Sequence, residues 1–216
     1  MATPADPTAA PVAAAPAATP TVYNPPKPPA RAAGEFTRAL GLMRSDPTQA
    51  SLEFQLMTQS YPDLPGPYAN LGLLYRNANQ LTEAESSFQK ATEHAPWDAA
   101  TWTEYGVTLR QAGKFAEART AYEKAIALNP NYAPAHRNLG VLLDLYLEDS
   151  LTAQSELETY KTLTGEDKPV SGWLAELRSR NKSAAPRAPK EDIQAPAPET
   201  PAPEAAASDA PKPQGG

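Results

Sequence analysis

The chain has 216 residues, of which 25 are proline and none is cysteine. Without cysteine it forms no disulfide, thiolate metal site or cysteine nucleophile. Its 19 basic and 25 acidic residues leave a net charge of -6, which argues against a general nucleic-acid-binding protein. No apolar run reaches the roughly 18 residues of a membrane-spanning helix, so we expect no membrane span.

Proline is concentrated at the two ends of the chain. Nine prolines lie in residues 1–30, eight in residues 183–216 and the other eight in between. Frequent proline removes backbone donors and clashes with the preceding turn, and large apolar side chains are too few to offset an ordering cost of about 1–2 kcal/mol per residue. We predict disordered Ala/Pro-rich tails over 1–33 and 183–216. Each tail is a spacer or docking ligand, or else a solvated segment without a partner, which the composition favours.

The beginning of the chain leaves the compartment open. Met1-Ala2-Thr3-Pro4 is not followed by the basic start and apolar core of a signal peptide. Either the protein is cytoplasmic as written, or an export signal has been removed and it is periplasmic or envelope-associated. An Ala/Pro/Thr linker before a folded domain is common in bacterial envelope proteins, so both alternatives stand.

The middle of the chain repeats with a period of 34 residues. Pro62, Pro96 and Pro130 keep that spacing. So do several other sets: Ala50, Ala84 and Ala118; Phe54, Phe88 and Tyr122; Tyr68 and Trp102; Gly72 and Gly106. A fixed period in this range is the signature of a solenoid. The pattern predicts two antiparallel helices in each unit, with glycine or alanine where helices approach closely and proline after the second helix. Gly113, and Asn79 one unit earlier, stand where the turn between the helices needs a positive φ.

This pattern resembles the tetratricopeptide repeat (TPR), a 34-residue pair of helices with the signature W-x2-L-G-x2-Y…A-x3-F…P. Residues 99–132 fill eight of its columns with Trp102, Tyr105, Gly106, Leu109, Ala118, Tyr122, Ala125 and Pro130. The resemblance implies an all-α solenoid of antiparallel helix pairs, flanked by the two tails. At least three repeats are needed for a continuous core, and the chain has enough for the array to fold alone.

We assign the solenoid to residues 34–166, with regular units at 65–98, 99–132 and 133–166. The unit at 34–64 is degenerate, because Thr37 and Arg38 occupy the apolar and glycine columns of its first helix. In the last unit one residue is inserted around Asp144–Asp149, where we expect a longer first helix or a bulged turn. Residues 167–182 predict an amphipathic capping helix whose apolar face carries Val170, Trp173, Leu174 and Leu177.

The resemblance also implies a binding groove on the concave face, which the first helices line. Carried over by register, its residues are Ala69, Leu73, Arg76, Asn77, Thr103, Val107, Arg110, Gln111, Arg137, Val141, Asp144 and Leu145. Such a groove has an apolar floor with three arginines beside it, which suits an extended or helical peptide with apolar anchors and some acidic character. The alternative for the apolar residues is packing between first helices. The residues do not match the carboxylate-clamp subtype, which has Lys and Asn at the fifth and ninth positions.

No catalytic set stands out in the sequence. His94 and His136 have no partners at metal-ligand spacing, and there is no phosphate loop, nucleophile elbow or dinucleotide fingerprint. We therefore expect no enzyme, metal or cofactor, and a protein partner rather than a nucleic acid. The leading hypothesis is a non-catalytic adaptor that binds a partner protein. The alternatives are an accessory or assembly subunit of a bacterial envelope machine (pilus assembly, secretion or wall synthesis) and an enzyme with an unrecognised site. The oligomeric state stays open.

Overall fold

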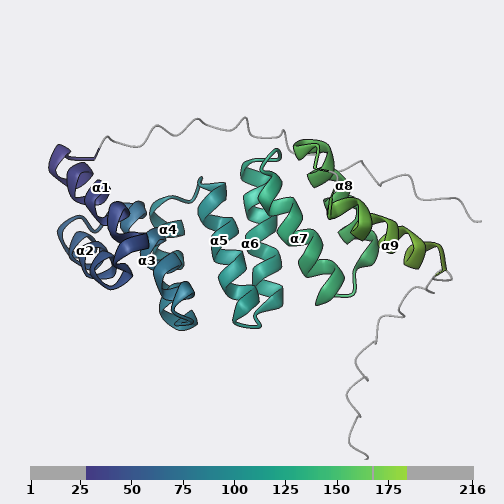
Figure 1. Cartoon of the computed structure of the whole chain (residues 1–216), viewed down its shortest axis with the longest axis horizontal. Coiled ribbons are helices and arrows are strands. Elements are labelled where there is room, and N and C mark those ends of the chain that lie inside the picture. Colours follow the sequence, from purple (N-terminus) through teal and green to yellow (C-terminus); the bar gives the residue numbers. More distant parts are fainter. Residues whose placement is uncertain (1–27, 167, 184–216) are drawn as a thin grey trace, which may run out of the picture. The chain divides into compact units, whose positions relative to one another are not determined.

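The computed structural model describes residues 28–166 and 168–183. In these residues the chain forms nine α-helices and no strand, and the helices follow one another in a stack (Figure 1). The predicted all-α solenoid is confirmed. Most of both predicted tails, 1–27 and 184–216, lies outside the described residues.

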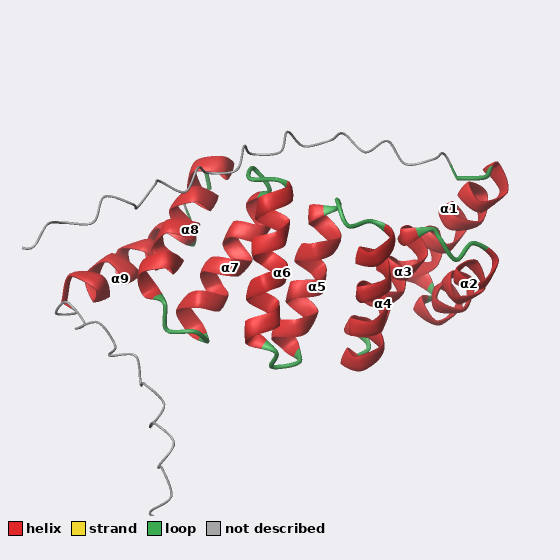
Figure 2. Ribbon diagram, turned by 180° about the vertical axis from the view of Figure 1, so that it is seen from behind, coloured by secondary structure: helices red, strands yellow, loops and turns green. Residues whose placement is uncertain are grey.

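The helices form four pairs and a single final helix. Their bounds are α1 Ala30–Ser45, α2 Pro47–Ser60, α3 Pro65–Asn77, α4 Leu81–His94, α5 Ala99–Gln111, α6 Phe115–Leu128, α7 Ala133–Leu145, α8 Ser150–Thr164 and α9 Val170–Ser183. Each helix packs against the next one through α8, and α5 also packs directly against α3 and α7 (Figure 2). The first helices of the pairs therefore share one layer, as the repeat pattern predicts.

The two helices of a pair approach most closely at the glycine column. A Cβ at Gly106 would lie 2.5 Å from Cε1 of Tyr122, and one at Gly72 would lie 2.7 Å from Cδ2 of Phe88. Both rings are buried. Each ring occupies the space that the missing Cβ leaves within its own pair, so any larger residue in this column has to displace it.

Two predicted turns have the expected backbone. Gly113 has φ 77° and Asn79 has φ 59°. Each lies between the first and second helix of its pair, where the left-handed conformation reverses the chain. Glycine adopts this conformation freely and asparagine better than most other residues.

The inserted residue in the last pair lengthens the turn and not the helix. Helix α7 has 13 residues, as α3 and α5 have. The connection to α8 runs through Tyr146–Asp149, and Glu148 takes a positive φ of 54°. Tyr146 stacks on Phe115 with 4.5 Å between ring centroids. Of the two expected outcomes, the bulged turn is the one observed.

The first helix differs from the sequence-based interpretation in two ways. It begins at Ala30, so residues 30–33, predicted as disordered tail, are helical, and Ala32 is buried. It also runs to Ser45 and meets α2 through Asp46 alone, where the next two pairs have a three-residue turn. Ala39, next to Arg38, is therefore the fully buried small residue that packs in one cluster with Phe54.

Helix α9 covers the last pair with Val170, Leu174 and Leu177, which are buried in one cluster with Leu143, Leu157 and Tyr160. Its last residue is Ser183, one residue into the predicted tail. Trp173 is half-buried and packs against the same cluster. It also borders the layer of first helices, where the candidate site lies.

Candidate functional site

A cleft of about 450 Å³ lies between the first helices α5 and α7 and the final helix α9. Its lining residues are Arg110, Arg137, Asn138, Val141, Asp144, Leu145, Leu157, Trp173, Glu176 and Arg180. Side chains from three neighbouring helices meet here because α9 stands beside α7, where a further first helix would stand. The cleft has an apolar floor and charged walls.

Five of the predicted groove residues lie together in this cleft: Arg110, Arg137, Val141, Asp144 and Leu145. Leu145 is 65% exposed. Val141 is half-buried, and Arg137 is exposed. These five residues line the hollowed part of the predicted groove.

Two predicted groove residues are engaged in the fold itself. The guanidinium of Arg76 donates to the Glu104 carboxylate at 2.6 Å and to the Glu104 backbone carbonyl at 3.0 Å, and its side chain is 14% exposed. Its Cζ lies 5.7 Å from the Phe88 ring centroid. Thr103 is buried, and its hydroxyl donates to the carbonyl of Ala99. The expectation of three open arginines beside the groove is therefore wrong for Arg76, because Glu104 reaches across from the next repeat.

The remaining predicted residues lie outside the cleft. Ala69, Leu73 and Val107 are half-buried on α3 and α5, whereas Asn77 and Gln111 are exposed at the ends of these helices. No described cleft brings them together with the five residues above. They contribute to the layer of first helices but not to its hollowed part.

Sequence reasoning missed the wall that α9 provides. Trp173, Glu176 and Arg180 all line the cleft. The groove residues were predicted from repeat positions, and the last assigned repeat ends before α9. The signal was present in the amphipathic pattern. A capping helix that covers α8 has to stand beside α7, so the residues flanking its apolar face also flank the groove.

Contacts between the walls set the charge of the cleft. Arg180 forms an ion pair with Asp144 at 2.6 Å, and the Arg137 guanidinium lies 5.7 Å over the ring of Trp173. Neither Arg110 nor Arg137 forms an ion pair with another described residue. The charges of Arg180 and Asp144 cancel each other. Of the other charged residues that line the cleft, two are arginines and only Glu176 is acidic, so the cleft is locally positive in an acidic chain.

Beneath the cleft, Arg110 lies near the buried ring of Tyr122. Burial raises the pKa of Tyr122 because it disfavours the charged phenolate, and the nearby Arg110 guanidinium opposes that shift. The Nε of Arg110 is buried and has no hydrogen-bond partner among the described residues. The stem of Arg110 is thus anchored in the core while the residue lines the cleft.

The family comparison agrees with this architecture. A tetratricopeptide repeat profile matches residues 66–96, and a second TPR repeat profile matches residues 106–144. The chain is a tetratricopeptide repeat protein. None of the curated proteins matches it.

Solved structures resemble this TPR protein in fold. PilF of Pseudomonas aeruginosa is 19% identical, with a TM-score of 0.63 over 70% of this chain and 69% of PilF. MamA of Desulfovibrio magneticus RS-1 is 18% identical, with a TM-score of 0.63 over 71% of this chain and 87% of MamA. The first TPR of Spaghetti (RPAP3), solved with the HSP90 peptide SRMEEVD, is 21% identical, with a TM-score of 0.51 over 54% of this chain and 91% of its own.

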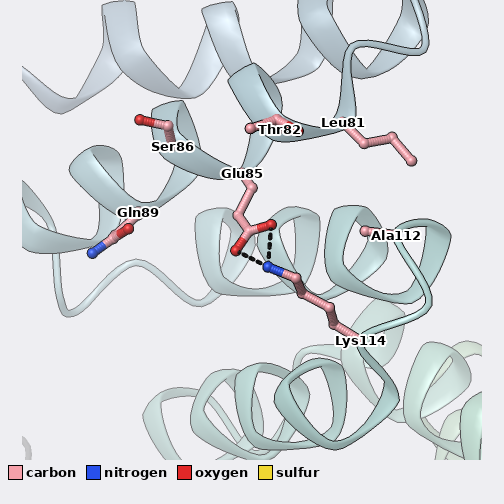
Figure 3. Close-up of a pocket in the computed structure, with 7 residues that line it drawn as sticks. All are labelled: Leu81, Thr82, Glu85, Ser86, Gln89, Ala112 and Lys114. Atoms are coloured by element: carbon pink, nitrogen blue, oxygen red, sulfur yellow. Dashed lines mark hydrogen bonds and ion pairs between the residues drawn. The ribbon is translucent and has the colours of Figure 1, made fainter.

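Two further clefts of the TPR array are less suited to a partner. One of about 400 Å³ lies along α4 and the turn before α6, where Lys114 donates to Glu85 at 2.7 Å (Figure 3). That hydrogen bond raises the pKa of Lys114, and the pair occupies the middle of the cleft. The other, about 360 Å³ between α1 and α3, is lined mainly by Phe36, alanines and prolines and offers no charged group.

Both histidines of the TPR array have structural contacts. His136 donates through Nε2 to the carbonyl of Pro130 at 2.9 Å, as Trp102 does through Nε1 to Pro96 at 3.1 Å. Its Nδ1 lies 2.6 Å from Glu156 Oε2. His94 stacks on Tyr68 with 5.5 Å between centroids. The described residues contain no group of histidine, aspartate and glutamate side chains suited to a metal ion, and none of their helices is long and apolar enough to cross a membrane.

Proposed function

We propose that this TPR protein is a non-catalytic adaptor that binds a segment of a partner protein in the cleft between α5, α7 and α9. The observation that carries the proposal is the convergence of five register-predicted residues with three residues of α9 around one hollow. Repeats of this family and their solved neighbours support a protein–protein interaction role.

The chemistry of the cleft suits a peptide better than a small metabolite or a reaction. Val141, Leu145 and Trp173 offer apolar surface that gains from being covered, because burial returns roughly 25 cal/mol per Å². The charged groups lie at the rim, where they select and orient a partner more than they add raw affinity. No residue in the hollow forms the nucleophile–base pair that catalysis needs.

The Spaghetti repeat is a precedent for peptide binding on this fold, since that structure holds an HSP90 peptide. We infer a different mode of recognition for this chain. Its fifth repeat positions are Ala69, Thr103 and Arg137, and its ninth positions are Leu73, Val107 and Val141. The apolar ninth positions and the wall from α9 favour a ligand with an apolar anchor.

A photo-crosslinking experiment tests the site. A photoreactive amino acid replaces Leu145 in the cleft or, as a matched control, Leu151 on α8, which is 72% exposed and lines no described cleft. We expect the same partner band from native extract at position 145 in repeated experiments, and none at position 151. Equal labelling at both positions, or labelling at 151 alone, contradicts binding in the cleft.

A second candidate is an accessory subunit of a bacterial envelope machine. It is supported by the Ala/Pro-rich segment before a short repeat array and by a fold shared with the Pseudomonas aeruginosa protein PilF. The adaptor role above is compatible with it. Fractionation of the native host separates the two settings: recovery with envelope membranes or periplasm supports this candidate, and recovery in the cytosol alone rejects it.

A further inference from the structure

We infer that the partner segment is acidic, with two carboxylates and an apolar side chain between them. The inference rests on the proposed function and adds the chemistry of the partner to the place where it binds. Arg110 and Arg137 carry it, because both line the cleft and neither is paired with a described carboxylate.

The distance between the two carboxylates follows from the repeat register. Arg110 and Asp144 are 34 residues apart and thus occupy the same level of successive first helices, while Arg137 precedes Asp144 by seven residues on α7. Seven helical residues rise about 10 Å along the axis, and the axes of packed helices lie roughly 8–10 Å apart, so the backbones of the two arginines are on the order of 14 Å apart. Val141 lies between the two levels and lines the same cleft. A ligand spans this distance with about four residues of extended chain.

The charge of Arg110 is not neutralised by the fold, because α7 carries Asn138 where the preceding repeat carries a glutamate. One repeat earlier, the equivalent Arg76 is held by Glu104. The residue 34 positions after Glu104 is Asn138, which lines the cleft and carries no charge. Arg110 therefore lacks the carboxylate that neutralises Arg76, and its Nε is left without a partner among the described residues. A partner carboxylate supplies the missing charge through a charge-assisted hydrogen bond.

Arg137 is held in place without being neutralised. Its guanidinium lies over the Trp173 ring at 5.7 Å, a cation–π distance. This contact restrains the side chain and leaves its positive charge for an incoming anion. Trp173, Val141 and Leu145 then surround the apolar side chain of the ligand. The arrangement pairs two cations with one apolar floor, which is complementary to an acidic–apolar–acidic segment.

The test selects binders from a displayed library of random 12-residue peptides, with the full chain as bait. Fluorescence anisotropy then measures the best peptide against six variants, the sixth being Leu145→Asn described below. Arg110→Gln and Arg137→Gln remove the two charges. Asn138→Glu recreates the Glu104 carboxylate one repeat later, and Asn138→Gln is its neutral control. Arg119→Gln, in an exposed ion pair with Glu123 on α6, is the control for loss of an arginine.

We expect selected peptides to carry paired acidic residues around an apolar one. Arg110→Gln, Arg137→Gln and Asn138→Glu weaken binding about tenfold or more, as expected for charge-assisted hydrogen bonds. Arg119→Gln stays within about twofold, and Asn138→Gln weakens binding less than Asn138→Glu does. Replacing both acidic residues of the peptide by glutamine abolishes the difference between Arg110→Gln and the unmodified chain.

Leu145→Asn separates failure of the inference from failure of the proposed function. If this variant loses binding while the arginine variants retain it, or if selected peptides lack acidic residues, the cleft binds peptides but the acidic partner is wrong. If selected peptides bind Leu145→Asn and both arginine variants as well as they bind the unmodified chain, or if no peptide is selected at all, both fail. Circular dichroism checks that each variant is folded.

Discussion

Arg76 and Arg110 occupy the same position in successive repeats, yet they have different surroundings. Arg76 is largely buried, paired with Glu104 across the gap between α3 and α5, and lies against Phe88. Arg110 faces Asn138 and α9 and pairs with no described carboxylate. One column of the repeat is therefore a structural tie in one place and, as we propose, a binding group in the next. The neighbouring residue at 104 or 138 differs, and only Arg110 lines a cleft with α9.

The largest expected effect tests whether the helix pair that carries Arg76 and the pair that carries Arg110 are packed in the same way. Gly72→Val and Gly106→Val place side-chain atoms where Phe88 and Tyr122 lie, since a Cβ alone would come within 2.7 Å and 2.5 Å of these rings. We expect each variant to lower the free energy of unfolding by about 3 kcal/mol, from overpacking in a dense core. Urea unfolding followed by circular dichroism measures it.

If both glycine variants lower the free energy of unfolding by similar amounts, the two helix pairs are packed alike. The surroundings of the two arginines then differ in charge and not in core packing. A loss at one glycine and none at the other would mean that the two pairs are packed differently. Gly41→Val on α1 is a control, because a Cβ there meets no described atom within 4 Å.

A smaller effect distinguishes Arg76, which ties two repeats together, from Arg110, which we propose binds the partner. Glu104→Gln leaves the Arg76 guanidinium, 14% exposed, without its carboxylate. We expect a loss of about 1–2 kcal/mol in the free energy of unfolding, because Glu104 is itself partly exposed and the bond to its backbone carbonyl remains. Asn138→Ala should change stability by less than about 0.5 kcal/mol. Equal effects of the two substitutions in urea unfolding would remove the distinction between the two arginines.

Much of the fold follows from residues whose role is local or periodic. Gly106 stands at a fixed position within the repeat, so the close approach of two helices there is predicted by the spacing alone, whereas the contact with Tyr122 within the same pair comes from the structure. The positive φ of Gly113 and Asn79 follows from the length of the turn. In α1 the same reasoning failed, because the connection through Asp46 is two residues shorter and moves the small residue to Ala39.

The candidate site was less predictable. Whether an arginine there is ion-paired depends on side chains of neighbouring helices, and the repeat register does not show these contacts. Arg76 and Arg110 look alike in the sequence. Only the arrangement of α3 against α5 shows that Glu104, 28 residues later, reaches Arg76. Likewise, Trp173 reads as part of an apolar capping face, and only the placement of α9 beside α7 brings it over Arg137.

The smallest expected effect concerns α9, which forms a wall of the cleft beside Arg110 and has no counterpart beside Arg76. Arg180→Gln breaks the ion pair with Asp144, in which the carboxylate is 17% exposed and the arginine 48% exposed. Because one partner is in water, we expect a loss of only about 0.5–1 kcal/mol in stability. The structural consequence should be larger at the C-terminal end of α9, since Val170 and Leu174 continue to hold its beginning. Hydrogen exchange should therefore accelerate at residues near Arg180 and stay unchanged in α3 and α4. Arg178→Gln, which breaks a more exposed pair with Glu158 on α8, is the control. If Arg180→Gln accelerates exchange no more than Arg178→Gln does, the pair with Asp144 does not hold the wall of the cleft.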